Sequence, residues 1–510
     1  MKKYILIVAA FFTAGISGCK KNYLDLEVNP NTPSITTPAL TLAAALNAST
    51  GIIVNDYQQY GVWDGYWTTS GNYVPNQGIN QYQFTNSSFQ QDWIDWYANL
   101  TNYNVLEGVS TKSGAAEYEA IAKIMKAYGF SHLVDNYNDV PYSQAFQGTS
   151  VLLPVYDKGP AIYTDLFKQL DAAIALLKPI AENSTVAPAV TGDIMFNGAA
   201  NPAQAWIMFA NTLKLRMAIR VSAVSGFTAS TIMATTAAAA DVPGSDTNFL
   251  GENIEGDVNP GYSDVGGKQN PFYANYGLDP TGNLAGGATY YRAGAYCVNT
   301  LIRFNDPRAP YYYTLVPTSS SDATPRVHGN VFGDVSSTNL TSTYTSSQGP
   351  GLSQSAAQNS VLLSGYESLF LQAEAVQKGY LTAGGTTPQA LYEAAITTSF
   401  LDLGLTAAQA SAYYSQTPAI ANVNWSASTP ENAIITQKWL SLNSYFNFEA
   451  WNEYRRTGIP ALPSSIDPAA ISPTLPTRLP YPLTELETNP GNLAKEGTIN
   501  PFKDKIFWAK

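Results

Sequence analysis

Residues 201–221 read NPAQAWIMFANTLKLRMAIRV. Asn201 is a favourable N-cap, and Pro202 follows at the first helical position, where a missing N–H costs nothing. Apolar residues recur at helical spacing at Trp206, Phe209, Leu213 and Met217. Further apolar residues lie outside that stripe at Ile207, Met208, Leu215, Ala218 and Ile219. A helix that is apolar on nearly every side is a buried one, so this stretch predicts a central helix with other helices packed around it.

The same stretch carries three cations, at Lys214, Arg216 and Arg220. A charged group in a surrounded helix needs an ionic partner or a path to solvent. We therefore expect partners for these three side chains.

Composition excludes several classes of function. The chain has 510 residues, 45% of them hydrophobic and only 13% charged, with a net charge of -11. An acidic body without a basic run after the N-terminus argues against nucleic acid as a partner. The 2 His residues lack zinc-site spacing, and no metal or cofactor is expected. The 33 Tyr and 9 Trp suit stacking on sugars, although they serve equally well in a core.

The N-terminus has the form of a targeting segment. Lys2 and Lys3 precede an apolar run over residues 4–14, and the segment ends in Ile16-Ser17-Gly18-Cys19. That ending resembles the lipobox of bacterial lipoproteins, in which the cysteine is acylated. We predict a signal peptide over residues 1–18, a lipidated Cys19 and a polar tether over residues 19–37. A plain signal peptide or an N-terminal helix is the alternative. A lipidated Cys19 would leave Cys297 without a disulfide partner.

The rest of the chain predicts a single, mainly α-helical domain over residues 38–510. Amphipathic stretches occur in pairs over about 38–225 and 361–458, which favours a superhelix of tetratricopeptide type with degenerate repeats. One long helix is expected over residues 431–454. Residues 226–360 form a loop-rich insert, with strand-like pieces such as 311–316 but no clear amphipathic helix. Residues 459–510 are a Pro-rich C-terminal segment.

Aromatic residues without helical period are the candidates for ligand binding. They occur in two groups, one in the loop over residues 63–84 and one in the insert. Flat exposed rings beside amide groups suit sugar rings. Burial or contact with a transporter remains the alternative for each single ring. The candidates are Trp63, Tyr66, Trp67, Tyr73 and Asn76 from the loop, and Tyr273, Tyr276, Tyr290 and Tyr291 from the insert.

Two sets of acidic and amide residues could have other functions. Glu449 and Glu453 stand one helical turn apart, as a glycosidase pair could, but ion pairing with nearby arginines is the plainer interpretation. Asp135, Asn138 and Asp139 could bind calcium, but they lack EF-hand spacing, and a turn that ends a helix is favoured. No nucleophile-elbow, P-loop or zinc-protease motif occurs, so no catalytic residue is expected.

The chain resembles the SusD/RagB family of outer-membrane lipoproteins over nearly its whole length. The resemblance rests on short motifs in a fixed order. They are Tyr23-Leu24-Asp25, Asn29-Pro30-Asn31, residues 135–145 (DNYNDVPYSQA), the central helix, Ala373-Glu374-Ala375, Arg455-Arg456-Thr457-Gly458 and Arg478-Leu479-Pro480-Tyr481-Pro482.

This resemblance implies a surface-exposed, lipid-anchored protein that is not an enzyme. Such a protein captures a glycan or a peptide, the glycan being favoured here, and delivers it to a TonB-dependent, SusC-like transporter. The fold implied is four tetratricopeptide-like helix pairs with a ligand face built from loops. Two alternatives stay open: a helical-repeat scaffold that binds only protein, and a surface glycoside hydrolase.

Overall fold

A computed structural model describes residues 37–510, except 56, 184, 186–187, 235–245, 323 and 337–339. The predicted signal peptide, Cys19 and nearly all of the predicted tether lie outside the described residues.

The chain is mainly α-helical, as predicted. The part before the insert contains α2 (Pro38–Asn55), α3 (Tyr57–Trp63), α4 (Gln77–Asn80), α5 (Gln90–Ser113), α6 (Ala116–Tyr137), α7 (Gly159–Ala181) and α8 (Pro202–Arg220). The insert contains α9 (Ala229–Met233), α10 (Pro271–Tyr276), α11 (Gly286–Tyr290), α12 (Ala295–Arg303) and α13 (Ala309–Tyr312). The last part contains α14 (Gly365–Gln377), α15 (Pro388–Asp402), α16 (Ala407–Tyr414), α17 (Pro430–Ser441), α18 (Asn447–Thr457), α19 (Leu483–Thr488) and α20 (Pro490–Leu493).

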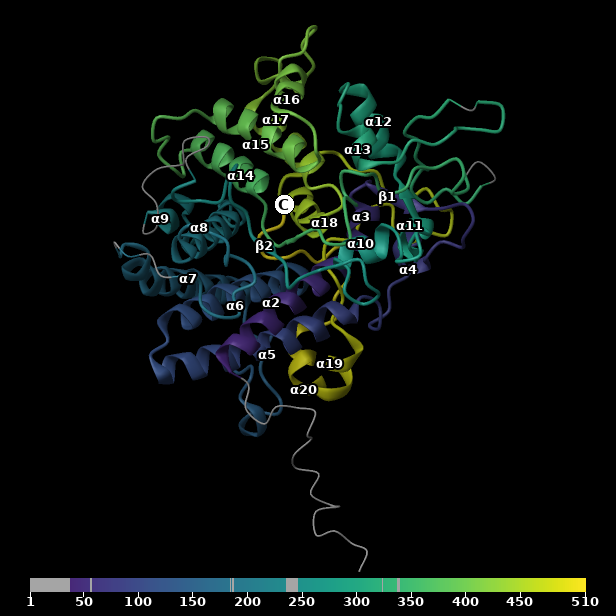
Figure 1. Cartoon of the computed structure of the whole chain (residues 1–510). Coiled ribbons are helices and arrows are strands. Elements are labelled where there is room, and N and C mark those ends of the chain that lie inside the picture. The colour runs from purple at the N-terminus through teal and green to yellow at the C-terminus, as the bar shows by residue number, and fades with distance from the viewer. Residues whose placement is uncertain are drawn as a thin grey trace, which may run out of the picture.

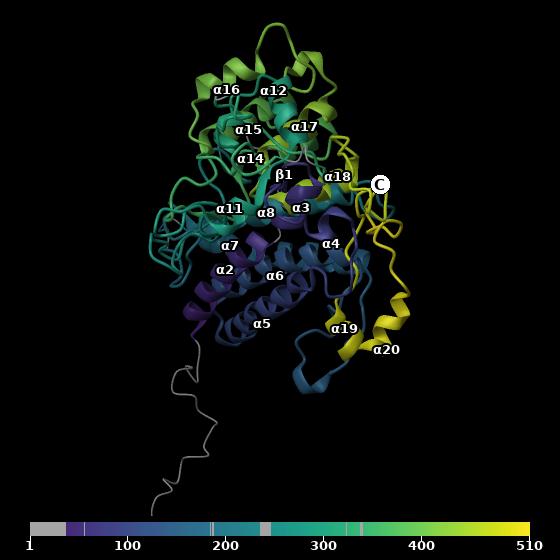
Figure 2. The ribbon, with the colours of Figure 1, turned by 90° about the vertical axis from the view of Figure 1, so that its right-hand side faces the viewer.

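The long helices pack as sequential neighbours, as the predicted helix pairs require. In the first part α2 packs against α5, α5 against α6, α6 against α7 and α7 against α8. In the last part α14 packs against both α15 and α17. The two groups form separate layers, with α2, α5, α6 and α7 below and α14 to α17 above (Figures 1 and 2). Helix α8 joins them, because it packs against both α7 and α14.

The central helix is buried as predicted, and its cations have partners. Every residue of α8 except Gln204 is buried, and Asn201 Oδ1 accepts a hydrogen bond from the Gln204 backbone N–H at 3.2 Å. Lys214 pairs with Asp171 of α7, Arg216 with Glu367 of α14, and Arg220 with Asp135 of α6 and Glu449 of α18. Three cations on one helix thus connect it to four others.

Two predictions about local structure are wrong. The helix expected over residues 431–454 is divided into α17 and α18, because Ser444 adopts a φ of 75° and its N–H donates to Asn447 Oδ1 at 3.0 Å. A side-chain acceptor of this kind competes with the helical ladder. The strand-like residues 311–316 contain the end of α13, with only isolated bridges at Tyr313 and Val316. The insert also contains α12 and four shorter helices, and α16 follows α15; none of these was predicted.

The strands form two small antiparallel pairs, in agreement with the expected minor β content. They are β1 (Trp67–Thr69) with β3 (Tyr291–Ala293), and β2 (Asp257–Val258) with β4 (Ser360–Val361). The first pair attaches the insert to the loop before it, and the second joins the insert to its own C-terminal end.

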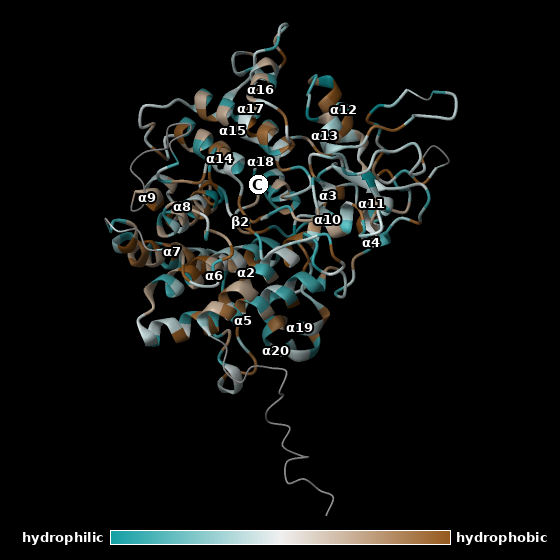
Figure 3. Cartoon of the chain, viewed as in Figure 1, coloured by the Kyte–Doolittle hydropathy of each residue, from teal (hydrophilic) through white to brown (hydrophobic). Residues whose placement is uncertain are grey.

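Apolar residues occur on the helices of both layers (Figure 3). Among the described residues, the stretch Pro38–Trp63 alone is long and apolar enough to cross a membrane by length and composition, which is weak evidence. Helix α2 packs against α5, with Leu42 and Leu46 fully buried. Part of its apolar surface is thus buried inside the protein.

Candidate ligand-binding site

The two predicted aromatic groups are brought together by one short strand pair. Strand β1 follows Trp63 and Tyr66, and β3 begins at Tyr291. The antiparallel register sets Trp67 opposite Ala293 and Thr69 opposite Tyr291. Just beyond it, the Ser70 N–H donates to the Tyr290 carbonyl at 2.8 Å. The loop over residues 63–84 and the insert therefore form one surface.

Most of the predicted rings lie beneath that surface. Trp63, Tyr66 and Trp67 are 0% exposed, and Tyr276 and Tyr291 are also buried. These rings therefore lack the exposure that a stacking platform requires, which corrects the expectation for them. The reason is packing against distant segments, because the absence of helical period does not by itself keep a ring at the surface.

The partners of Tyr66 and Trp67 come from the last part of the chain and from the insert. Tyr66 stacks on Trp439 of α17, with ring centroids 5.1 Å apart. Trp67 Nε1 donates to Ser444 Oγ at 3.0 Å, and its ring lies 4.8 Å from that of Tyr276. These buried rings therefore pack beneath the loop over residues 63–84 and the insert.

Tyr73 and Tyr290 remain at the surface. Tyr73 is 44% exposed, Tyr290 is half-buried, and their ring centroids are 5.3 Å apart with planes at 50°. Tyr290 Oη donates to the Val74 carbonyl at 3.1 Å, and Tyr73 Oη donates to Thr289 Oγ1 at 3.3 Å. These bonds join the tip of the loop to α11 and hold the two rings together.

The other two candidates have local structural roles. Asn76 is exposed, but its Oδ1 caps α4 by accepting from the Ile79 N–H at 3.2 Å. Tyr273 lies half-buried on α10, and its N–H donates to the capping Asn270 side chain. Of the predicted residues, Tyr73 and Tyr290 are thus the ones that the structure brings together at the surface.

Arg292 organises this face and was missed by sequence reasoning. Its guanidinium, which is buried in β3, donates to the carbonyls of Ala288, Ser342 and Thr345. Burial lowers the pKa of Arg292 to about 10, so it stays protonated at neutral pH.

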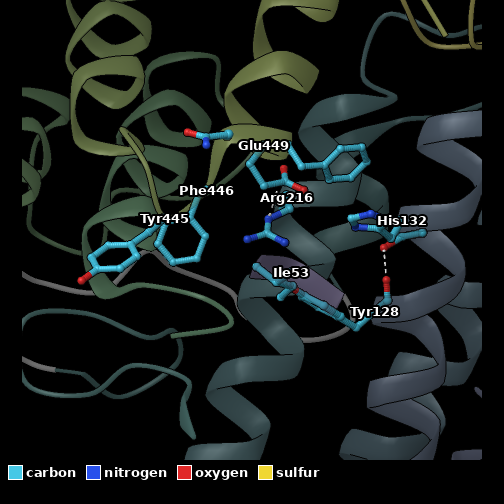
Figure 4. A pocket seen from close by; sticks show the side chains of 10 residues that line it. Ile53, Tyr128, His132, Arg216, Tyr445, Phe446 and Glu449 are labelled. Carbon is cyan, nitrogen blue, oxygen red and sulfur yellow. Dashed lines mark hydrogen bonds and ion pairs between the residues drawn. The ribbon is translucent and has the colours of Figure 1, made fainter. Parts of the chain in front are cut away.

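A small cavity in the core is not a ligand site. It lies among α6, α8 and α18 and is lined by Tyr128, His132, Arg216, Phe446 and Glu449, with five others (Figure 4). Its volume of about 20 Å³ leaves room for about one water molecule. His132 packs against Phe448, with ring centroids 3.8 Å apart, and fills the core as a neutral residue.

The glutamates of α18 are ion-paired. Glu449 contacts Arg216 and Arg220, and Glu453 contacts Lys438 and Arg456. Burial opposes ionisation, yet the two guanidinium groups beside Glu449 hold its pKa below the ordinary value. A glycosidase acid needs a raised pKa and access to substrate, and neither glutamate has them.

The turn over residues 135–139 ends α6. Asp135 accepts from Tyr163 Oη at 2.6 Å and Trp508 Nε1 at 2.7 Å, and Asp139 pairs with Lys158 at 2.8 Å. Asn138 is the C-cap, with a φ of 70°. Over the described ranges, no group of three His, Cys, Asp or Glu residues could hold a metal ion. The favoured interpretation as a helix-terminating turn is confirmed.

Comparison with known proteins agrees with this architecture. A family model named SusD-like, described as starch-binding associating with outer membrane, matches residues 29–482. No curated protein sequence shows significant similarity.

Among solved structures, a SusD homologue from Bacteroides uniformis has a TM-score of 0.68 at 22% identity, covering 92% of this chain and 99% of its own. A chitin-binding SusD homologue from Flavobacterium johnsoniae has a TM-score of 0.70 at 22% identity, covering 92% and 98%. A SusD/RagB family protein from Bacteroides thetaiotaomicron has a TM-score of 0.71 at 19% identity, covering 93% and 99%.

Proposed function

Because the chain belongs to the SusD-like family, we propose that it is an outer-membrane protein that binds nutrient oligomers, glycans in preference to peptides. The relatives support this proposal, since one of them is a chitin-binding protein. The observation that carries it here is the Tyr73–Tyr290 pair, two rings held at the surface by hydrogen bonds to neighbouring loops.

The form of this pair suits a sugar. Two rings 5.3 Å apart with planes at 50° present an angled apolar surface, and such a surface matches the C–H face of a pyranose ring. Thr289, which accepts a hydrogen bond from Tyr73, supplies a polar group beside it. A ring fixed before binding loses little conformational entropy when the ligand arrives.

Delivery to a transporter is the second part of the proposal. We place a lipid on Cys19, so that the tether over residues 19–37 holds the helical body at the outer membrane, exposed on the cell surface. A TonB-dependent, SusC-like channel is the proposed recipient of the ligand. Binding without catalysis is supported by the ion pairs of Glu449 and Glu453, which leave neither carboxylate available for acid catalysis.

A binding panel with product analysis tests the proposal. The purified mature protein is titrated calorimetrically with starch, chitin and other oligosaccharides and with a matched set of peptides, and each mixture is then analysed for cleavage. We expect at least one glycan to bind and to remain intact. Cleavage of the bound glycan would support a hydrolase instead. Binding of peptides alone, or of no ligand while a partner protein co-purifies, would also contradict the proposal.

A further inference from the structure

A second cavity, whose lining includes neither Tyr73 nor Tyr290, has three carboxylates in its walls. It has a volume of about 400 Å³, within the range of small-ligand sites. Glu255 and Asp257 line it from the start of β2, and Asp402 from the last position of α15. Tyr312 of α13 and Tyr445, in the turn between α17 and α18, also line the cavity.

These carboxylates have no cationic partner. No ion pair of Glu255, Asp257 or Asp402 occurs within the described part of the chain, and none of the residues lining the cavity is Lys, Arg or His. Three glutamates of the core differ in this respect, because Glu367, Glu449 and Glu453 each meet an arginine. A cluster of carboxylates without nearby cations costs free energy. A cation that binds from outside the chain would offset that cost.

One polar atom in the wall also lacks a partner. It does not belong to Tyr312, which is 1% exposed and whose hydroxyl lies beside Ser399, another residue of the lining. Asp257 Oδ2 accepts from Asn359 Nδ2 at 2.8 Å, but its Oδ1 has no partner among the described residues. A carboxylate oxygen that binds nothing within the described part of the chain is available to a ligand.

The pKa values of Asp402 and Glu255 are raised, in agreement with their position near other carboxylates in the cavity wall. Desolvation in the wall, followed by the charge of Asp257, raises the pKa of Asp402 to about 7. Burial, followed by the charges of Asp402 and Asp257, raises the pKa of Glu255 well above its ordinary value. Asp402 is itself an exposed residue at the end of α15.

A wider hollow of about 640 Å³ shares Glu255, Asp257 and Asn359 with this cavity. Side-chain amides dominate its polar lining, and amides hydrogen-bond to sugar hydroxyls. They belong to Asn197, Asn201, Gln204, Asn253 and Asn259. Glu255 and Asp257 therefore lie at the boundary between the first cavity and this amide-lined hollow.

We propose that this cavity binds the protonated amine of an amino sugar within a glycan, with Glu255, Asp257 and Asp402 facing the ammonium and the amide-lined hollow receiving a neighbouring sugar. The inference rests on the proposed function, since it names a chemical group of the ligand. A metal ion is disfavoured, because the described residues contain no group of three acidic, His or Cys ligands placed to hold one. An ammonium group can bind oxygens of several different residues, because each of its three N–H groups can donate to a different acceptor.

The test compares ligands that differ only at the amine. The full mature protein is titrated at pH 7.5 with a β-1,4-linked glucosamine tetramer and with its N-acetylated counterpart. We expect the amine form to bind at least ten-fold more tightly, and we expect Asp402→Asn to remove most of that preference. Glu393→Gln, on the same helix α15 and outside the cavity lining, is the matched control and should leave the preference unchanged.

A second measurement guards against a misfolded variant. Removing one of three repelling carboxylates should leave the melting temperature of Asp402→Asn equal to or above that of the parent at pH 7.5. Equal affinity for the two tetramers would overturn the inference while leaving the proposed function standing, whereas failure to bind any glycan would overturn the proposed function. Asp402-dependent binding of trilysine or of calcium alone, without binding of the glucosamine tetramer, would also overturn the inference.

Discussion

Arg216 and Glu367 are joined by two parallel hydrogen bonds, Nε to Oε1 at 2.8 Å and Nη2 to Oε2 at 2.7 Å. The residues are 151 positions apart, and their side chains are 4% and 0% exposed. This pair links the central helix α8 to α14 and so joins the two helical layers. Its geometry is the bidentate one that suits a buried arginine.

Removing the Glu367 charge should destabilise the fold strongly. Glu367→Gln leaves the Arg216 guanidinium without its main counter-charge in the core, and breaking a buried pair typically costs about 3–5 kcal/mol. The free energy of unfolding in urea measures the loss. Glu182→Gln is the control, since Lys178 and Glu182 are 65% and 66% exposed and 3.8 Å apart, and it should change stability by about 0.5 kcal/mol or less. Equal effects of the two variants would contradict this account.

Stability should depend on His132 below neutral pH. Burial lowers the pKa of His132 to about 4, whereas an unfolded histidine titrates at about 6.5. Below pH 6.5 the unfolded chain therefore takes up a proton that the folded chain accepts only near pH 4. The stabilising contribution is complete above pH 6.5 and is lost as the pH falls through this window, amounting to about 3 kcal/mol.

Comparing His132→Gln with the parent isolates this effect from other titrations. The parent should lose more stability than the variant between pH 6.5 and 4, as measured by urea unfolding at each pH. Parallel pH profiles would show that His132 is not held neutral by its surroundings.

The exposed rings should contribute directly to ligand binding. Tyr73→Ala and Tyr290→Ala should each weaken glycan affinity by about three- to ten-fold, the loss of one aromatic contact, without changing the helical circular dichroism. Tyr380→Ala, just beyond α14, should leave affinity unchanged. Unchanged affinity in both loop variants would remove the Tyr73–Tyr290 surface from the site.

Trp67 should behave as a core residue. It is 0% exposed, and its indole N–H donates to Ser444 in the turn before α18, so Trp67→Ala should lower the free energy of unfolding by about 3–5 kcal/mol. Thermal unfolding measures this directly. A variant with normal stability and reduced ligand affinity would show instead that the ring reaches the ligand.

The anchor is tested by cell fractionation. Cys19→Ala removes the thiol that would carry the lipid, so the protein should move from the membrane fraction to the soluble fractions. Replacing the distant Cys297, which is buried and unpaired, by Ser should leave the protein in the membrane fraction. Retention of Cys19→Ala in the membrane would refute the lipid anchor.

The sequence was sufficient to predict features that depend only on residues close together in the chain. The start of α8 follows from Asn201 and Pro202, and its burial follows from apolar residues on every side, so the central helix was predictable. The need for partners at Lys214, Arg216 and Arg220 was predictable for the same reason. The identity of those partners was not, because Asp171, Glu367, Asp135 and Glu449 come from four other helices.

The aromatic loop shows what only the tertiary structure decides. Tyr66, Trp67 and Tyr73 occupy one short segment and look alike in the sequence, yet the first two are buried and the third is exposed. The burial of Tyr66 and Trp67 depends on Trp439 and Ser444, more than 370 positions away, and on the β1–β3 register. Helical period and capping are encoded within a few residues, whereas the burial of a ring or the pairing of a charge depends on which distant segments the fold brings against it.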